Sequence, residues 1–224
     1  WADTPMTDQN RKGYDSMTMS GLGGAARDRR VRMLGAVFLP MLLAGLPGCA
    51  SKAPNDTFDL SASAVVSTNA SAKNRQLLIA DPTALKAVDS EQILVRVSNS
   101  EIRYLSKSQW SDKLTRMVQS KLVEAFEDTG RLGGVGKPGQ GLAIDYQLIT
   151  DVRAFEVATV GGDRGVVEIS AKLLNDRNGT VVAQKVFRAE ARAAGTSNEA
   201  YVKAMDEAFG SVTAEIVTWA LTAI

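Results

Sequence analysis

The chain has 224 residues, of which 45% are hydrophobic and 23% are charged, proportions typical of a globular domain. It contains no histidine and a single cysteine, which excludes Ser-His-Asp and Cys-His catalysis and any internal disulfide, and makes a zinc site improbable. No catalytic residue, cofactor or metal site is predicted from the composition.

Charge is divided unevenly along the chain. Residues 1–48 hold six Lys and Arg against four Asp, so 20 basic and 21 acidic residues remain from Cys49 onward. A nearly neutral remainder lacks the clustered basic face that displaces counterions from nucleic acid. No nucleic-acid partner is predicted.

The N-terminal segment has the pattern of a targeting signal. Trp1 is not a natural start, so Met19 or Met33 is the expected initiator and residues 1–18 are predicted to be a non-native or unstructured extension. A basic stretch then precedes residues 33–48, which carry no charge. That order is typical of a secretory signal peptide, here residues 19–48. A transmembrane anchor and a buried core helix are the alternatives, but the run is short for a span and contains Pro40 and Pro47.

Cys49 follows this apolar run directly. The segment Leu46-Pro47-Gly48-Cys49 resembles the lipobox of bacterial lipoproteins, with an aliphatic residue at −3, a small one at −1 and then the acylated cysteine, although Pro47 replaces the usual small residue at −2. A lone cysteine can also be a small buried hydrophobe. Its position after a signal segment favours lipidation, so Cys49 is the one predicted site residue. Ala50 and Ser51 in place of an aspartate favour the outer membrane, by resemblance to enterobacterial lipoproteins.

The mature part begins with a tether and short strands. Residues 49–57 are predicted to be a lipidated tether, and residues 58–224 to be one folded domain. Apolar runs predict short strands over 58–66 and 76–80, and a pair over 92–97 and 101–105.

A first helix is expected from a cap at Ser108 to about Asp128, with Gly130 just past its end. Trp110 falls on its apolar stripe, so we interpret this residue as core rather than interface. Gly134-Val-Gly136-Lys-Pro-Gly139 fits the letters of the dinucleotide fingerprint, but it follows a helix and precedes a strand. It is predicted to be a loop.

Three long strands and a last helix complete the domain. Strands are predicted over 142–157, around 167–173 and over 180–194, with a hairpin turn at Asn178-Gly179. Gly161-Gly162-Asp163 is predicted to be a second turn. A capping box formed by Thr196 and Glu199 would start an apolar stripe that runs from Tyr201 to Ala220 and includes Trp219. The fold class is therefore α+β: a mostly antiparallel sheet with two main amphipathic helices packed on one face. The carboxylates Asp145, Asp151 and Glu156 match a solvated strand face and are interpreted as surface.

An ordered series of short motifs resembles the ABC-type transport auxiliary lipoproteins of the PqiC type. The motifs are Asp81-Pro82, Val88-Asp89-Ser90, Glu101-Ile-Arg-Tyr-Leu105, Gln109-Trp-Ser-Asp-Lys-Leu114, Val118-Gln-Ser-Lys-Leu-Val-Glu124 and Asp151-Val-Arg-Ala-Phe-Glu156. The similarity covers nearly all of residues 58–222.

The resemblance implies a non-catalytic lipoprotein, held in the outer membrane by Cys49 and facing the periplasm. Its partners would be an MCE-domain protein and the ABC permease and ATPase of an intermembrane lipid transport system, and a homo-oligomer is compatible with it. The alternative is an outer-membrane assembly or envelope-structural lipoprotein.

Overall fold

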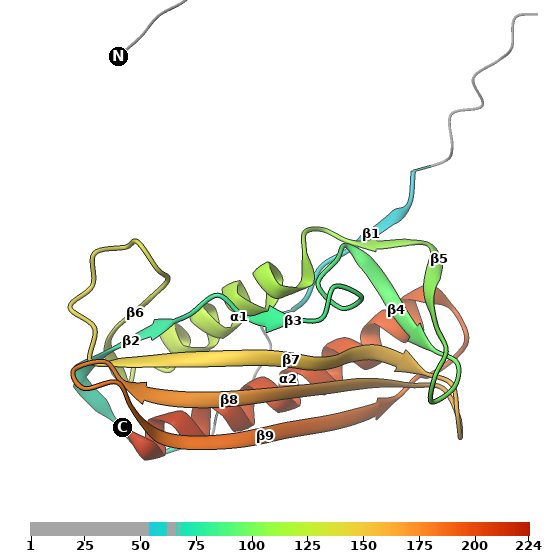
Figure 1. Cartoon of the computed structure of the whole chain (residues 1–224). Coiled ribbons are helices and arrows are strands. Elements are labelled where there is room, and N and C mark those ends of the chain that lie inside the picture. Colours follow the sequence, from blue (N-terminus) through green and yellow to red (C-terminus); the bar gives the residue numbers. More distant parts are fainter. Residues whose placement is uncertain (1–53, 62–65, 67) are drawn as a thin grey trace, which may run out of the picture. The chain divides into compact units, whose positions relative to one another are not determined.

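The computed structural model describes residues 54–61, 66 and 68–224 (Figure 1). The predicted extension 1–18, the signal peptide 19–48 and Cys49 lie outside these residues, as does most of the tether. The elements of the described part are β1 (Asp56–Phe58), β2 (Ala72–Ile79), β3 (Thr83–Ala84), β4 (Gln92–Arg96), β5 (Ile102–Trp110), α1 (Leu114–Asp128), β6 (Leu132–Gly136), β7 (Tyr146–Ala158), β8 (Arg164–Asn175), β9 (Thr180–Arg192) and α2 (Asn198–Ala223).

All of these strands belong to one sheet, organised around β7. One edge of β7 pairs with β8 in a long antiparallel ladder, and β8 pairs with β9 in the same way. Along its other edge β7 pairs in succession with β2, β3 and β4, and each of these short pairings is parallel. The α+β class is confirmed, and the long ladders are antiparallel as predicted. The parallel pairings were not foreseen, because a pattern of alternating residues does not reveal strand direction.

Both helices contribute to one buried hydrophobic cluster together with one face of the sheet. In Figure 1, α2 runs along β8 and β9, and its apolar stripe lies against the buried side chains of β8. Aromatic rings link the layers: Phe155 on β7 lies 5.7 Å from Trp110 and 5.6 Å from Phe209 of α2. The predicted apolar stripe of the last helix and the core position of Trp110 are thus confirmed.

A bulge in β7 changes which residues face the helices. Val152 pairs with Ile169, but Ala154 pairs with Glu168, so Arg153 is an extra residue on β7. An inserted residue reverses the alternation of faces. Leu148 and Val152 are buried before the bulge, and the odd-numbered Phe155 and Val157 after it. Glu156 consequently points to the face that carries no helix.

Two predicted helix starts are wrong. Ser108 lies within β5, and α1 begins only at Leu114, because the Trp110 amide donates to the carbonyl of Glu91 (2.7 Å) and Trp110 also pairs with β1. The cap of α2 is Ser197, one residue after the predicted Thr196, and its hydroxyl accepts from the Ala200 amide at 3.2 Å.

The glycine-rich segment is also different from the prediction. Residues Leu132–Gly136 form β6, in parallel register with β2, rather than a loop. A Cβ on Gly133 would lie 2.5 Å from the carbonyl oxygen of Lys73, so glycine permits an approach of the two strands that a side chain would block. The turns at Gly161-Gly162 and Asn178-Gly179 are confirmed.

Candidate interaction surface and the groove at its end

The sheet face away from the helices carries charged side chains in register. On β9, Ala189 and Ala191 pair with Val167 and Gly165 on the helix side, so the residues that alternate with these alanines point to the opposite face. Those residues are Arg188, Glu190 and Arg192. We call this side of β7, β8 and β9 the outer face.

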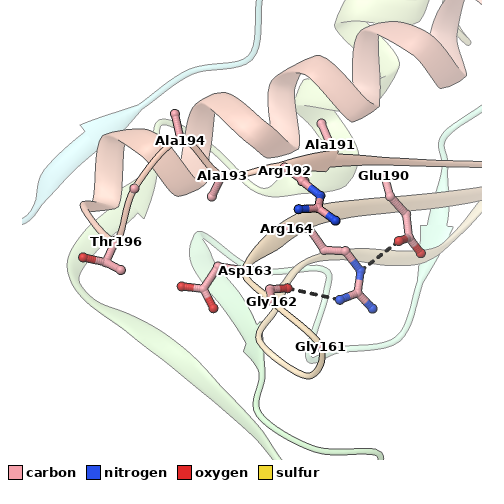
Figure 2. Close-up of a pocket in the computed structure, with 11 residues that line it drawn as sticks. Gly161, Gly162, Asp163, Arg164, Glu190, Ala191, Arg192, Ala193, Ala194 and Thr196 are labelled. Atoms are coloured by element: carbon pink, nitrogen blue, oxygen red, sulfur yellow. Dashed lines mark hydrogen bonds and ion pairs between the residues drawn. The ribbon is translucent and has the colours of Figure 1, made fainter.

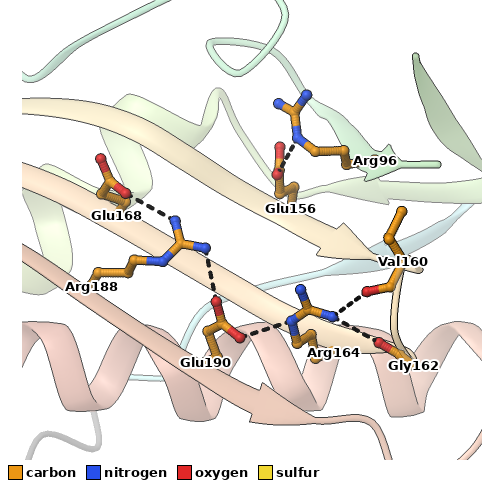
Figure 3. A network of polar contacts seen from close by, with 8 residues as sticks. All are labelled: Arg96, Glu156, Val160, Gly162, Arg164, Glu168, Arg188 and Glu190. Atoms are coloured by element: carbon orange, nitrogen blue, oxygen red, sulfur yellow. Dashed lines mark hydrogen bonds and ion pairs between the residues drawn. The ribbon is translucent and has the colours of Figure 1, made fainter. Parts of the chain in front are cut away.

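Four of its side chains form a chain of alternating charge (Figure 3). Arg188 donates to Glu168 at 2.9 Å and to Glu190 at 2.8 Å, and Arg164 donates to the other oxygen of Glu190 at 2.8 Å. The hydrogen bond from Arg188, supported by Arg164, lowers the pKa of Glu190, and the two carboxylates raise the pKa of Arg188. Partly exposed pairs of this kind contribute roughly 0.2–1 kcal/mol each. Their effect is to fix where the charges lie.

A second ion pair on the outer face is more deeply placed. Arg96 Nε lies 2.5 Å from Glu156 Oε1, and the side chains are 37% and 6% exposed, respectively. This hydrogen bond raises the pKa of Arg96. The second oxygen of Glu156 is buried and has no partner in the described part of the chain. Interpreting Glu156 as a surface residue was therefore wrong, because the bulge turns it toward Arg96.

The charged face ends in a groove of about 810 Å³ (Figure 2). It is lined by the β7–β8 turn, by the last residues of β9 and by the segment that leads into α2. Arg164 anchors the turn, because its Nη1 donates to the carbonyls of Val160 (2.6 Å) and Gly162 (3.1 Å). Gly161 and Gly162 have φ values of +78° and +108°, which glycine adopts without strain.

Tyr201 fastens this turn to α2. Its hydroxyl donates to Asp163 at 2.6 Å, and this hydrogen bond raises the pKa of Tyr201. Next to it, β8 has Gly165, where a Cβ would lie 2.3 Å from the Met205 amide nitrogen of α2. The helix therefore contacts the strand backbone directly at this end of the molecule. The hydrogen bond thus ties Asp163, one of the residues that line the groove, to α2.

In residues 54–61, 66 and 68–224 there is no cluster of three or more Asp, Glu or Cys side chains placed to hold a metal ion. Across the same residues, no helix combines the length and the apolar character needed to traverse a bilayer.

The sequence singled out few of these residues. Cys49, the one predicted site residue, lies outside the described part. Asp151 is exposed as expected, whereas Asp145 is mostly buried and accepts the Gln76 amide at 3.0 Å, which lowers the pKa of Asp145. The outer-face network was missed. Its signal is the alternation of charge with alanine from Arg188 to Arg192, which places the charges on one face of a strand.

The motifs that carry the family resemblance hold α1 in place. Gln119 donates to the carbonyl of Ile79 at 3.0 Å and to Asp81 at 2.9 Å, and Thr115 donates to Asp89 at 2.7 Å. These bonds connect the helix to the chain between β2 and β4. The motifs are therefore structural.

Comparison with known proteins identifies the family. Residues 58–217 match the ABC-type transport auxiliary lipoprotein components. The chain belongs to this family. A solved structure resembles its fold. Protein XCC0632 from Xanthomonas campestris, a DUF330 protein, is 30% identical, with a TM-score of 0.68 over 75% of this chain and 95% of that one.

Two further relatives extend the comparison. A crystal structure of an uncharacterized protein has a TM-score of 0.59 at 16% identity, covering 73% of this auxiliary lipoprotein and 97% of that chain, which shows a shared fold. Uncharacterized protein bll6063 from Bradyrhizobium diazoefficiens is 27% identical over 186 residues, which are 82% of this chain and 50% of that protein. The chain thus spans half the length of this curated relative.

Proposed function

We propose that this family member is a non-catalytic, periplasm-facing subunit of an MCE- and ABC-type intermembrane lipid transport system, anchored in the outer membrane by an acylated Cys49. The observation that carries the proposal is the family match over residues 58–217. The lipobox resemblance at residues 46–49 supports the anchor. Since one acyl chain binds a bilayer only marginally, stable anchoring requires the multiple acylation of a lipoprotein cysteine.

The outer face is proposed as the surface that contacts the MCE-domain protein or the permease. Its charges are held in fixed positions by Arg188, Glu190 and Arg164, and fixed charges favour a partner with a complementary pattern. Such contacts guide association and select partners more than they add affinity. A subunit that docks and is released needs this kind of surface. A homo-oligomer stays a prediction.

Crosslinking in intact cells tests the role. The full-length chain is purified from solubilised membranes after mild crosslinking, and MCE, permease and ATPase subunits are expected among the captured proteins. Recovery of an outer-membrane barrel protein or a peptidoglycan component in their place would support the assembly or envelope-structural role. Absence of all three transport subunits under conditions that retain the lipoprotein would refute the transport proposal.

Matched variants test the surface. Arg188→Ala removes the centre of the network, and Lys203→Ala removes an equally charged, exposed side chain on α2. The first variant is expected to lose captured transport subunits and the second to retain them. Circular dichroism must show both variants folded. Equal capture by the two variants would exclude the outer face as the contact surface.

Mass spectrometry tests the anchor separately. The membrane-extracted chain should begin at Cys49 and carry diacylglycerol and an amide-linked acyl group. Cys49→Ser should abolish both the acyl groups and the cleavage before residue 49. An unmodified Cys49 in membrane-extracted protein would refute the anchor and leave the transport role to the crosslinking result.

A further inference from the structure

The described chain enters the domain beside β5. β1 runs parallel to the last residues of this strand, with Asp56 opposite Ser108. Six residues separate Cys49 from Asp56, which makes seven Cα-to-Cα steps, and an extended chain spans at most about 3.6 Å per step. A lipid on Cys49 would therefore lie within about 25 Å of Asp56.

Three large apolar side chains are exposed near the start of β5 and in the β7–β8 turn. Ile102 lies six positions along β5 from Ser108, at most about 20 Å in a strand. Ile102 and Tyr104 on β5 are 38% and 41% exposed, and Val160 in the β7–β8 turn is 54% exposed. Ile102 pairs with Arg96, whose carbonyl accepts the Thr159 amide at 3.1 Å, so the turn lies beside the β4–β5 hairpin. Figure 3 shows Val160 and Arg96 at this end of the sheet. We call Ile102, Tyr104 and Val160 the apolar tip.

Three cations lie on β5 or beside the β7–β8 turn: Arg103, Lys107 and Arg192, which pairs with Arg164 in the β8–β9 ladder. Arg103 is exposed and pairs with Glu101 at 2.7 Å, whereas Lys107 and Arg192 form no ion pair with any described residue. Positive charge beside exposed aliphatic and aromatic groups is the composition that binds a bilayer interface.

Lys107 lies in a distorted part of the β5 backbone. Leu94 pairs with Tyr104 but Gln92 pairs with Gln109, so β5 carries a bulge between the two pairings. Within it Lys107 has a φ of +58°, a left-handed conformation unusual for a side chain of this kind. Asn198, the first residue of α2, holds the bulge by donating to the carbonyl of Ser106 (3.1 Å) and the hydroxyl of Ser108 (2.7 Å).

We propose that the apolar tip, with Lys107 and Arg192, contacts the lipid surface to which Cys49 is anchored, and that this contact orients the domain. The proposal rests on the proposed acylation of Cys49. Ile102 and Val160 would enter the headgroup region, and the Tyr104 ring would lie at headgroup depth with its hydroxyl in water. The two unpaired cations would face lipid phosphates. The turn at Asn178-Gly179, at the far end of β9, would then face the periplasm.

Quenching by labelled lipids tests this orientation. The full chain is produced with Ile102→Cys or, as a matched control, Val182→Cys, and the introduced thiol is labelled with an environment-sensitive fluorophore. The exposed fraction of Val182, 42%, is similar to the 38% of Ile102. Val182 nevertheless lies ten residues along β9 from Arg192, about 33 Å in a strand. The acylated protein is reconstituted in phosphatidylethanolamine–phosphatidylglycerol vesicles with headgroup-level nitroxide lipids.

A several-fold stronger quenching at position 102 than at position 182 is expected. Replacing phosphatidylglycerol by a zwitterionic lipid should reduce the difference, because the vesicle surface then lacks the net negative charge that attracts the cations. Equal or weaker quenching at position 102 in acylated protein would overturn the orientation while leaving the anchor intact. A chain shown by mass spectrometry to lack acyl groups would instead refute the anchor and, with it, the lipid contact argued from the tether.

Discussion

Gly165→Ala should loosen the packing of α2 on β8. The added Cβ would lie 2.3 Å from the Met205 amide nitrogen and 2.4 Å from the carbonyl carbon of Ala204. Contacts below 3.0 Å are essentially never observed for a Cβ, so the helix backbone would have to retreat by about 0.7 Å, the difference between 3.0 and 2.3 Å. Backbone atoms of a packed helix cannot rotate away as a side chain can.

The cost follows from the size of this displacement. Overpacking a well-packed interior costs typically about 1–3 kcal/mol, and a clash with backbone belongs near the upper part of that range. We expect a loss of about 2–3 kcal/mol, which lowers the Tm of a domain of this size by roughly 5–10 °C. The loss can be measured by urea and thermal unfolding of the full chain in detergent, followed by near-ultraviolet circular dichroism.

Gly134→Ala is the control for this experiment. It adds the same methyl group to a strand, but the nearest atoms belong to the Gln76 side chain at 3.6 Å, an ordinary contact. A glycine-to-alanine change at a compatible position stabilises by about 0.4–1 kcal/mol, because the unfolded chain loses freedom. Equal stability of the two variants would refute the direct backbone contact between α2 and β8.

Three further predictions concern the ion pairs and the groove. Arg96→Met should destabilise by about 2 kcal/mol, below the usual 3–5 kcal/mol because Arg96 is partly exposed, and Arg96→Met with Glu156→Leu should recover much of the loss in a double-mutant cycle. The folded-state pKa of Glu190 is lowered, so its ionised carboxylate stabilises the folded protein above the unfolded pKa, and this stabilisation is lost as pH falls through the folded pKa. Glu190→Gln should therefore flatten the fall of Tm between about pH 5 and pH 3. Tyr201→Phe removes a hydrogen bond to a carboxylate and should cost about 1–2 kcal/mol, with faster amide exchange in the β7–β8 turn; unchanged exchange there would contradict its fastening role.

Local patterns predicted the second half of the domain well. The alternation of Val167, Ile169, Ala171 and Leu173 placed β8, and the Asn178-Gly179 pair placed its hairpin with β9. The apolar stripe after residue 200 placed α2. These signals depend on neighbouring residues only, and the long antiparallel ladders and the long helix satisfy them without competition from distant segments.

Strand pairing between residues distant in the sequence determines the structure of the first half of the domain. Trp110 has helical spacing with Leu114 and Met117, yet it ends β5 because β1 and the segment before β4 supply its backbone partners. The glycines of β6 suit a loop by composition, and the need for glycine at Gly133 appears only when β2 approaches it. The bulge at Arg153 cannot be inferred from an alternating pattern, although it alone determines that Glu156 faces Arg96.

Paired charges on the outer face have a physical reason under the proposed docking role. An apolar face on three long strands would bind indiscriminately, and an unpaired charged face would be costly to desolvate. Glu190 is shared between Arg164 and Arg188, so a partner that binds would exchange these ion pairs for new ones. The net gain in binding free energy is then small, but the pattern of charge still guides the approach of the partner. Capture of transport subunits through this face should consequently weaken as salt screens the charges, whereas contacts made by the apolar tip with lipid should persist.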